Sequence, residues 1–476
     1  MPSKLTTPDP GRAVRVALAR LAEIDELIAR QVREVTRSKE FRRRERAWRS
    51  LKLLYDVVCE SDMLGMQPGV ELLICDLPAS ELVADLTEAS AWAKTRHGDV
   101  ESSSLFELCW RRMLGSFDAP AIGLLVLGFA IGDAEPGLDD GDAVLGSDGE
   151  TQAFLLELGR VAERCLMPCV IGLSSRVLGR SAPKRLTDGD PDLVWKREFQ
   201  WLGELRRAPS ARFLSFVLPQ LFLRQHDDPW VPRLPELQSR EGSPFVPELA
   251  TLWAGGQIGV AAALARSFLR TGWFCDMRGV RPSQASGSGP WSVVGGGVVP
   301  APRPPAFEAD SPDRAVRPAV SEIISEDVEE GLRLLGISSI LGVPGYPVAE
   351  TRVLQTFQRA RSDVPGESVD RAASQLVHLL SVCRIGHWLA RRGQEVLQQY
   401  MSEELIGHLR VRLSDLVSAA VLPTGESVKP FDSVDLRADI DGSGAMVLLV
   451  RVKPAAQYHE LRGELEISVP LLSGGT

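Results

Sequence analysis

The sequence has few of the features that mark the easily recognised protein classes. Its 476 residues include only 7 cysteines, which are widely spaced and so exclude the dense disulfide framework of a small secreted domain. The longest strongly apolar run, 119–131, is shorter than the ~20 residues that span a bilayer. The N-terminus has no apolar stretch of the signal-peptide type. We therefore expect a cytoplasmic chain with reduced thiols and no membrane insertion.

Net positive charge is lacking too. Lys+Arg 54 against Asp+Glu 63 gives a formal net charge of -9, so no overall positive field gathers nucleic acid. Bases concentrate only in 37–52, where they are interleaved with Phe41, Trp48 and Leu51. This pattern favours a helix with a solvated basic face over a nucleic-acid site, and the face could equally meet an acidic protein surface. We expect no nucleic-acid partner.

Catalytic and metal-binding motifs are missing as well. The sequence has no phosphate-binding loop, Gly-x-Ser-x-Gly elbow, His-Glu-x-x-His pair or kinase signature. The spacing of His378 and His387 does not suit two metal ligands on one helix face. Cys165 and Cys169 are too far apart for the usual redox or zinc pair, and the glycines of 255–259 fit helix packing. We expect no enzyme, no cofactor and no metal.

Apolar periodicity indicates what is present. From Val14 onward, apolar residues recur in alternating steps of four and three, which predicts a long amphipathic helix with Leu21, Ile28 and Val32 on its seam. Asp25 falls where a further apolar residue would belong. It either fixes register on the seam or lies at the edge of a stripe that is shifted by one position.

The middle of the chain alternates short apolar runs with helical patterns. This order predicts an α/β unit with a largely parallel sheet, whose expected elements are strands 70–77, 121–130, 169–173 and 211–218 and helices 80–95 and 151–165. The Gly/Pro-rich stretch 281–305 is expected to hold no regular element.

The C-terminal part is predicted to be helical and then antiparallel. Its expected elements are helices 323–335, 368–397 and 402–417, followed by strands 434–440, 446–452 and 461–469, with a turn at 441–444. The expected domains are N-terminal helices, an α/β core, a helix with a Gly/Pro-rich excursion, and a C-terminal helix-and-strand domain, at 1–65, 66–232, 233–320 and 321–476.

Several segments together resemble the large subunit of the type VI secretion contractile sheath, the TssC/VipB family. The most specific stretch is the helix 21–28 followed by Phe41, Glu45, Trp48-Arg49 and Leu51. Further similar segments bring the coverage to about 13–472; they are 123–126 with 168–170, 213–224, 253–280, 383–389 and 452–461. Only about ten residues precede the first helix, so we expect a divergent member without most of the family's N-terminal arm.

The resemblance implies a fold and a set of partners. The fold would be a sheath-protein-like α/β core with long N-terminal helices and a C-terminal antiparallel strand system. The partners would be a TssB/VipA-like small sheath subunit, other copies of the chain and an inner tube protein, with a AAA+ unfoldase and a baseplate further out. The chain would be a structural subunit that contracts to propel the tube.

Particular residues are expected to carry these contacts. The expected partner-interface residues are Leu21, Asp25, Ile28, Val32, Met446, Leu448, Val450 and Val452. Trp48, Arg49, Trp273 and Arg384 are expected to be structural, with Trp48 buried, because Trp anchors and Arg forks are typical of packing and interface hot spots. Two alternatives stay open: a sheath-derived regulator or cap that does not polymerise, and, more remotely, an α/β enzyme using Asp76, Asp118 and His226.

Overall fold

A computed structural model gives the fold of the chain. It describes residues 10–64, 69–96, 102–116, 119–132, 149–179, 182–189, 205–223, 252–274, 277, 280–282, 291–293, 297–300, 319–342, 348–351, 354, 356–357, 375–397, 402–417, 420–421, 427–440, 446–455 and 464–470.

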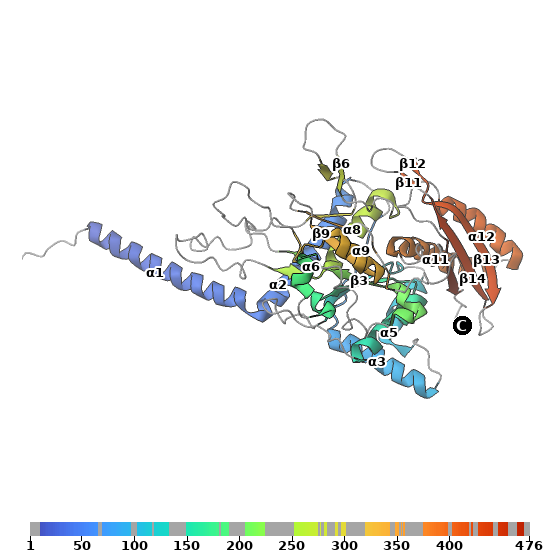
Figure 1. The fold of residues 1–476 in the computed structure, drawn as a ribbon, viewed down its shortest axis with the longest axis horizontal. Helices are drawn as coiled ribbons and strands as arrows, with labels where there is room; N and C mark the ends of the chain where they lie inside the picture. Colours follow the sequence, from blue (N-terminus) through green and yellow to red (C-terminus); the bar gives the residue numbers. More distant parts are fainter. Residues whose placement is uncertain are drawn as a thin grey trace, which may run out of the picture.

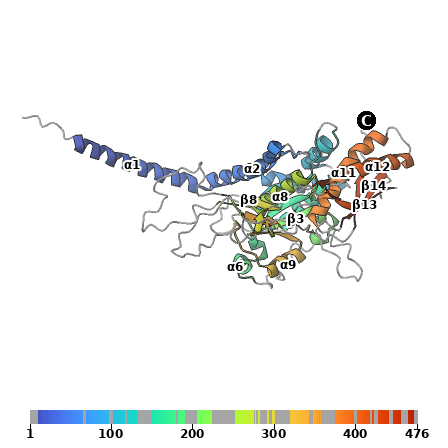
Figure 2. The same ribbon diagram turned by 90° about the horizontal axis from the view of Figure 1, so that it is seen from above.

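Two long helices form the N-terminal part. Helices α1 (Pro10–Arg37) and α2 (Lys39–Leu64) meet at Ser38. The Ser38 hydroxyl donates to the Val35 carbonyl at 2.7 Å and accepts from the Phe41 amide at 3.3 Å, so one side chain ends the first helix and caps the second. α1 projects away from the body of the molecule, whereas α2 lies on it (Figures 1 and 2).

A six-stranded sheet forms the centre, in the order β1-β2-β3-β9-β10-β8. The strands are β1 (Leu125–Ile131), β2 (Cys169–Leu173), β3 (Leu214–Leu218), β9 (Ile337–Gly342), β10 (Val348–Thr351) and β8 (Val298–Pro300). The first four are parallel to one another, and β10 is antiparallel to both of its neighbours, β9 and β8. Every residue of β2 and β3 is buried, as expected for parallel strands covered on both faces. The α/β fold class is confirmed.

Helices cover both faces of this sheet. On one face α8 (Gly256–Thr271) packs on β2 and β3, and α2 packs on α8. On the other face lie α5 (Gly149–Arg164) and α9 (Glu326–Leu334), with α3 (Ala79–Arg96) packed on α5. Figure 2 shows α2 and α9 on opposite sides of the body. The order of layers is therefore α2, α8, sheet, then α5 and α9.

Glycines at the start of α8 and in β2 allow the helix to approach the sheet closely. A Cβ on Gly256 would lie 2.5 Å from the Pro219 carbonyl oxygen, and one on Gly172 would lie 2.1 Å from Oε1 of Gln257. Gln257 donates from Nε2 to the Leu127 carbonyl of β1 at 3.0 Å. The interpretation of these glycines as helix-packing residues is confirmed.

The C-terminal part combines two helices with a second sheet. Helix α11 (Leu376–Leu397) packs on β14 and β15, and α12 (Ser402–Leu416) packs on α11 and β13. The sheet is antiparallel, in the order β13 (Phe431–Ile440), β14 (Met446–Pro454) and β15 (Leu465–Pro470). All three predicted strands are confirmed; the expected turn at 441–444 lies outside the described residues.

Shorter elements connect these units. They are α4 (Ser104–Phe106), a π-helical stretch (Glu107–Leu114), α6 (Ala182–Thr187), 3-10 turns (Ser175–Leu178, Leu205–Arg207, Pro209–Phe213) and the strand pairs β4 (Leu221–Phe222) with β5 (Trp253–Ala254), β6 (Val280–Pro282) with β7 (Trp291–Val293), and β11 (Ala420–Val421) with β12 (Ser427–Val428).

Three expectations about strands are wrong. Segment 70–77 is not a strand, and its Leu73 and Ile74 side chains are 56% and 65% exposed, because an apolar run does not by itself supply a pairing edge. The stretch 281–305 contains β7 and β8, where Gly297 fits because a Cβ there would lie 1.9 Å from the Met277 carbonyl oxygen. Strand β9 was not expected at all, and it brings a segment beyond residue 320 into the central sheet.

Candidate assembly interface

One side of α1 carries a stripe of exposed apolar side chains. Leu21 is 55% exposed and Ile28 is 51% exposed, and Val14, Leu18, Ile24 and Val35 are exposed to a similar degree. Asp25 is exposed, one turn after Leu21. The side chain of Val32 lies outside the described residues. An apolar stripe of this length on a helix is normally covered, so its exposure makes it a candidate interaction surface.

One side of α2 is buried, whereas the apolar side of α1 is exposed. Steps of seven residues join Leu21, Ile28 and Val35 on one side of α1, and α2 begins after the break at Ser38. Arg42, Arg46, Ser50, Leu54 and Val57 are all buried in α2, and Leu54 and Val57 pack in one cluster with residues of α8. Each helix therefore has one distinct side, and among the described residues only that of α2 is covered.

Trp48 lies on the opposite side of α2. Its side chain is 72% exposed, between the buried positions 46 and 50. The expectation of a buried indole is wrong, because the side of α2 that packs on α8 follows positions 42, 46, 50 and 54 and leaves position 48 facing solvent. Its neighbour Arg49 forms an ion pair with Glu45 inside the helix, at 2.8 Å between Nε and Oε1.

Trp273 and Arg384 lie at a joint between the two sheets. Trp273 is 4% exposed, and its ring meets that of Phe431 at the start of β13 edge-on, at 5.0 Å between centroids. The Arg384 guanidinium of α11 lies 4.3 Å from the Trp273 centroid and 4.9 Å from that of Phe268, and donates to the Gly272 carbonyl at the end of α8. This cluster connects α8, α11 and β13.

The inward side chains of β14 belong to the core of the chain. Leu448, Val450 and Val452 have 0% exposure and pack in one cluster with Ile467 of β15. This corrects their expected place in a partner interface. The side chain of Met446 lies outside the described residues. β14 is also paired on both sides, so only the outer edges of β13 and β15 present backbone groups to another chain.

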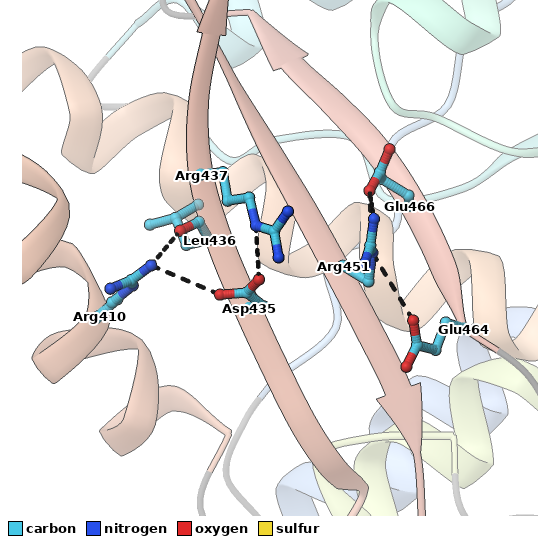
Figure 3. A network of polar contacts seen from close by, with 7 residues as sticks. All are labelled: Arg410, Asp435, Leu436, Arg437, Arg451, Glu464 and Glu466. Carbon is cyan, nitrogen blue, oxygen red and sulfur yellow. Dashed lines mark hydrogen bonds and ion pairs between the residues drawn. The ribbon is translucent and has the colours of Figure 1, made fainter.

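The outer side of this sheet carries charges that alternate with the buried residues (Figure 3). Asp435, Arg451 and Glu466 lie opposite one another on adjacent strands. Arg451 contacts Glu466 at 2.9 Å, and Arg410 of α12 contacts Asp435 at 3.6 Å and donates to the Leu436 carbonyl at 2.8 Å. Exposed pairs of this kind contribute little to stability, but they favour one register of the strands.

Two titratable side chains of the described interior illustrate the effect of burial. Burial raises the pKa of Cys109 to about 12, so this thiol stays protonated. His387 is buried and contacts the Cys165 carbonyl oxygen through Nε2 at 2.9 Å. Among the described residues, no three His, Cys, Asp or Glu side chains lie close enough together to hold a metal ion. Asp76 is exposed, and Asp118 and His226 lie outside the described residues.

Comparison with known protein families matches residues 19–349 to VipB, described as the EvpB/VC_A0108 tail sheath N-terminal domain. That match covers well over half of the sequence. The chain belongs to the VipB family of tail sheath proteins. As a VipB-family protein it is a type VI secretion sheath subunit of the TssC/VipB kind, and the family is structural. No curated protein matches the chain. In the described residues, no helix is both long and apolar enough to cross a membrane.

The VipB match includes most of α1, the whole of α2 and the sheet as far as β10. Sequence reasoning found the α1 stripe from its periodicity. It also predicted a solvated basic face on α2, but it placed Trp48 in the core and did not identify which residues of 326–334 face solvent, because a helical pattern shows that one side is buried but not which neighbour buries it.

Proposed function

We propose that the chain is the large subunit of a contractile sheath and that it binds a TssB/VipA-like small subunit along the apolar stripe of α1. The observation that carries this proposal is the contrast between two helices: α2 packs one side on α8, whereas no described residue covers the apolar side of α1. A helix of the small subunit would cover the apolar side of α1, as α8 covers one side of α2.

Burial of the α1 stripe would contribute part of the energy of a contact. Full burial of an exposed Leu or Ile contributes about 1.5–3 kcal/mol, and the stripe residues are about half exposed. Burying the remaining exposed half of each therefore contributes about 1 kcal/mol per residue, or about 6 kcal/mol for the stripe. An equal apolar area on the partner helix would double this figure, against a cost of association of about 4–15 kcal/mol.

The remaining parts of the proposed sheath function depend on the free edges of the C-terminal sheet and on the joint between the two sheets. The outer edges of β13 and β15 suit addition of strands from adjacent subunits. Contraction requires interfaces that are stable in two packings, and the joint around Trp273 and Arg384 would keep the two sheets of a subunit together during that change. An inner tube protein inside the sheath, a AAA+ unfoldase that disassembles it and a baseplate are the further partners that we propose.

Substitutions on the stripe test this proposal. Leu21→Asp and Ile28→Asp should abolish co-purification with the small subunit, because each places a charge in the apolar contact. Both side chains are exposed in the chain alone, so helix content and melting temperature should not change. Tubes should be visible by negative-stain microscopy for the wild-type pair and absent for both variants.

Ala19→Asp is the matched control. Ala19 is exposed, but it lies about 160° around the helix from Leu21, on the side opposite the stripe. Co-purification should survive this change. Equal losses for Ala19→Asp and Leu21→Asp would contradict a specific stripe. Stable binding of the small subunit without tubes would favour the regulator or cap over the sheath.

A further inference from the structure

A second exposed stripe lies on the solvent side of α2. Phe41, Trp48 and Tyr55 follow one another at intervals of seven residues, and their side chains are 38%, 72% and 60% exposed. Seven-residue steps place all three on one side of the helix. Two bases separate them along this side, Arg44 and Lys52, with exposed side chains of 74% and 64%. We call these five residues the aromatic-basic stripe.

The aromatic-basic stripe is unusual in a chain of this composition. The overall charge is -9, yet the part of α2 from position 39 to position 56 has seven basic and three acidic residues. Exposed aromatic side chains with basic neighbours are typical of contact hot spots. They also suit acidic protein surfaces, because guanidinium and ammonium groups pair with carboxylates.

A stripe of complementary character lies on α9. Ile323, just before the helix, is 55% exposed and Leu334 at its end is 52% exposed. Between them, Glu326, Asp327 and Glu330 are exposed on the same side, while Val328 and Leu332 on the other side pack into the core. We call these five exposed residues the acidic stripe. It presents carboxylates between two apolar ends, where the aromatic-basic stripe presents bases between aromatic rings.

We propose that the aromatic-basic stripe of one copy binds the acidic stripe of a second copy. This inference deepens the proposed function, because it names a surface through which copies of a sheath subunit contact one another. The two stripes lie on opposite sides of the body (Figure 2), so the contact is head to tail. Repeated head-to-tail contacts between unlike surfaces generate open helical arrays or rings, which is the arrangement that a sheath needs.

The strength of this contact follows from its size and charge. A contact between two five-residue stripes with three aromatic anchors lies at the small end of specific interfaces, below ~1,200 Å². Glu330 already pairs with Arg333, Arg44 with Glu40 and Lys52 with Asp56, and such exposed pairs exchange partners at little cost. The association is therefore reversible in solution and becomes stable only where other contacts hold the copies in register.

Charge reversal tests the pairing directly by sedimentation velocity on the full chain alone. One variant carries Arg44→Glu with Lys52→Glu, and the other carries Glu326→Lys with Glu330→Lys. Each variant alone should stay monomeric at concentrations where the wild type associates, because its two stripes then have the same sign. An equimolar mixture should associate again, because every contact in an alternating array then joins opposite signs.

Single substitutions complete the test. Trp48→Ala should weaken self-association by roughly tenfold or more, as removal of a central aromatic anchor does. Val411 on α12 is 67% exposed, and Val411→Ala should leave self-association unchanged. Leu21→Asp in every copy should leave it unchanged too, which separates this contact from association through α1. Circular dichroism and thermal melting check that each variant is folded.

Three results would overturn the inference. They are a wild type that stays monomeric at its highest soluble concentration, charge-reversed variants that associate as the wild type does, and a mixture that fails to recover. Loss of small-subunit binding in Trp48→Ala would also count against it, because the stripe would then face that subunit. Co-purification reports on α1 and sedimentation of the chain alone reports on the two stripes, so the proposed function and this inference can fail separately.

Discussion

Helices α1 and α2 carry the same pattern and meet different surroundings. In each helix, residues spaced three and four apart form one side that differs from the rest, and Ser38 alone separates the two helices. In α2 that side is buried, down to Arg42 and Arg46, and packs Leu54 and Val57 on α8, whereas in α1 it exposes Leu21 and Ile28. The difference teaches that the periodicity identifies a side of the helix but not what covers it. For α2 part of the cover is α8 of the same chain, and for α1 we propose that it is a partner.

Insertion of a charge should give the largest difference in stability between variants of the two helices. Leu54 is 9% exposed under α8, so Leu54→Asp should lower the free energy of unfolding by about 3–5 kcal/mol through an unpaired buried charge. Leu21→Asp on α1 should leave it within about 0.5 kcal/mol of the wild type. Urea denaturation followed by circular dichroism measures both. Equal effects of the two substitutions would remove the distinction between the helices.

The two tryptophans extend the same comparison to the joint between the sheets. Trp273 is 4% exposed beneath Arg384, so Trp273→Ala should destabilise the chain by about 3–5 kcal/mol. Trp48 is 72% exposed, and Trp48→Ala should change the free energy of unfolding by less than about 1 kcal/mol. Urea midpoints of the two variants provide the measurement. A large loss for Trp48→Ala would mean that its indole is packed within the single chain.

Acid should weaken the body of the molecule through His387. The pKa of His387 is lowered from 6.5 to about 4, mainly by burial and also by the nearby Arg391, against the opposing effect of the Cys165 carbonyl. Between these two pH values the unfolded chain binds a proton that the folded chain does not, so stability falls as the pH decreases through this window. The loss should reach about 2–3 kcal/mol near pH 4.

Urea midpoints measured from pH 7 down to pH 4 check this expectation. His387→Gln should flatten the curve, because an amide can still donate to the Cys165 carbonyl oxygen but does not take up the proton. A wild-type curve with the same slope as that of the variant would assign the acid sensitivity to other groups.

Ion pairs should give the smallest contrast. The Arg49 and Glu45 side chains in α2 are 18% and 12% exposed, whereas Arg20 and Glu23 in α1 are 73% and 59% exposed. Arg49→Gln should therefore cost about 1 kcal/mol, and Arg20→Gln should have an effect too small to measure. Thermal melting at low and high salt distinguishes the two. A larger effect at Arg20 would indicate that α1 is packed against the body in solution.

The sequence predicted elements wherever one residue pattern decided the structure. Strand β2 lies at its predicted bounds because a short run between Pro168 and Ser174 is uniformly apolar. Strand β9 was missed because it contains Ser338, whose hydroxyl lies 3.4 Å from that of Ser215 on the neighbouring strand. Because the two buried hydroxyls pair with each other, the core strand can hold a polar residue, and its sequence then lacks a uniformly apolar pattern.

The candidate site was predicted only in part, for a related reason. The α1 stripe follows from spacing alone, because a helical period identifies a face without reference to the rest of the chain. The burial of β14 and the exposure of Trp48 depend on which surfaces α11 and α8 cover. Those contacts join residues far apart in the sequence, and no local pattern contains them.

Hydrogen exchange of α1, measured with and without the small subunit, tests the central claim most directly. In the chain alone, the amides of α1 should exchange much faster than those of α2, because no described residue covers the apolar side of α1. On binding of the small subunit, exchange in α1 should slow to the level of α2, while exchange in α2 stays as it was. Exchange in α1 that is already slow in the chain alone, or that does not change on binding, would contradict the claim.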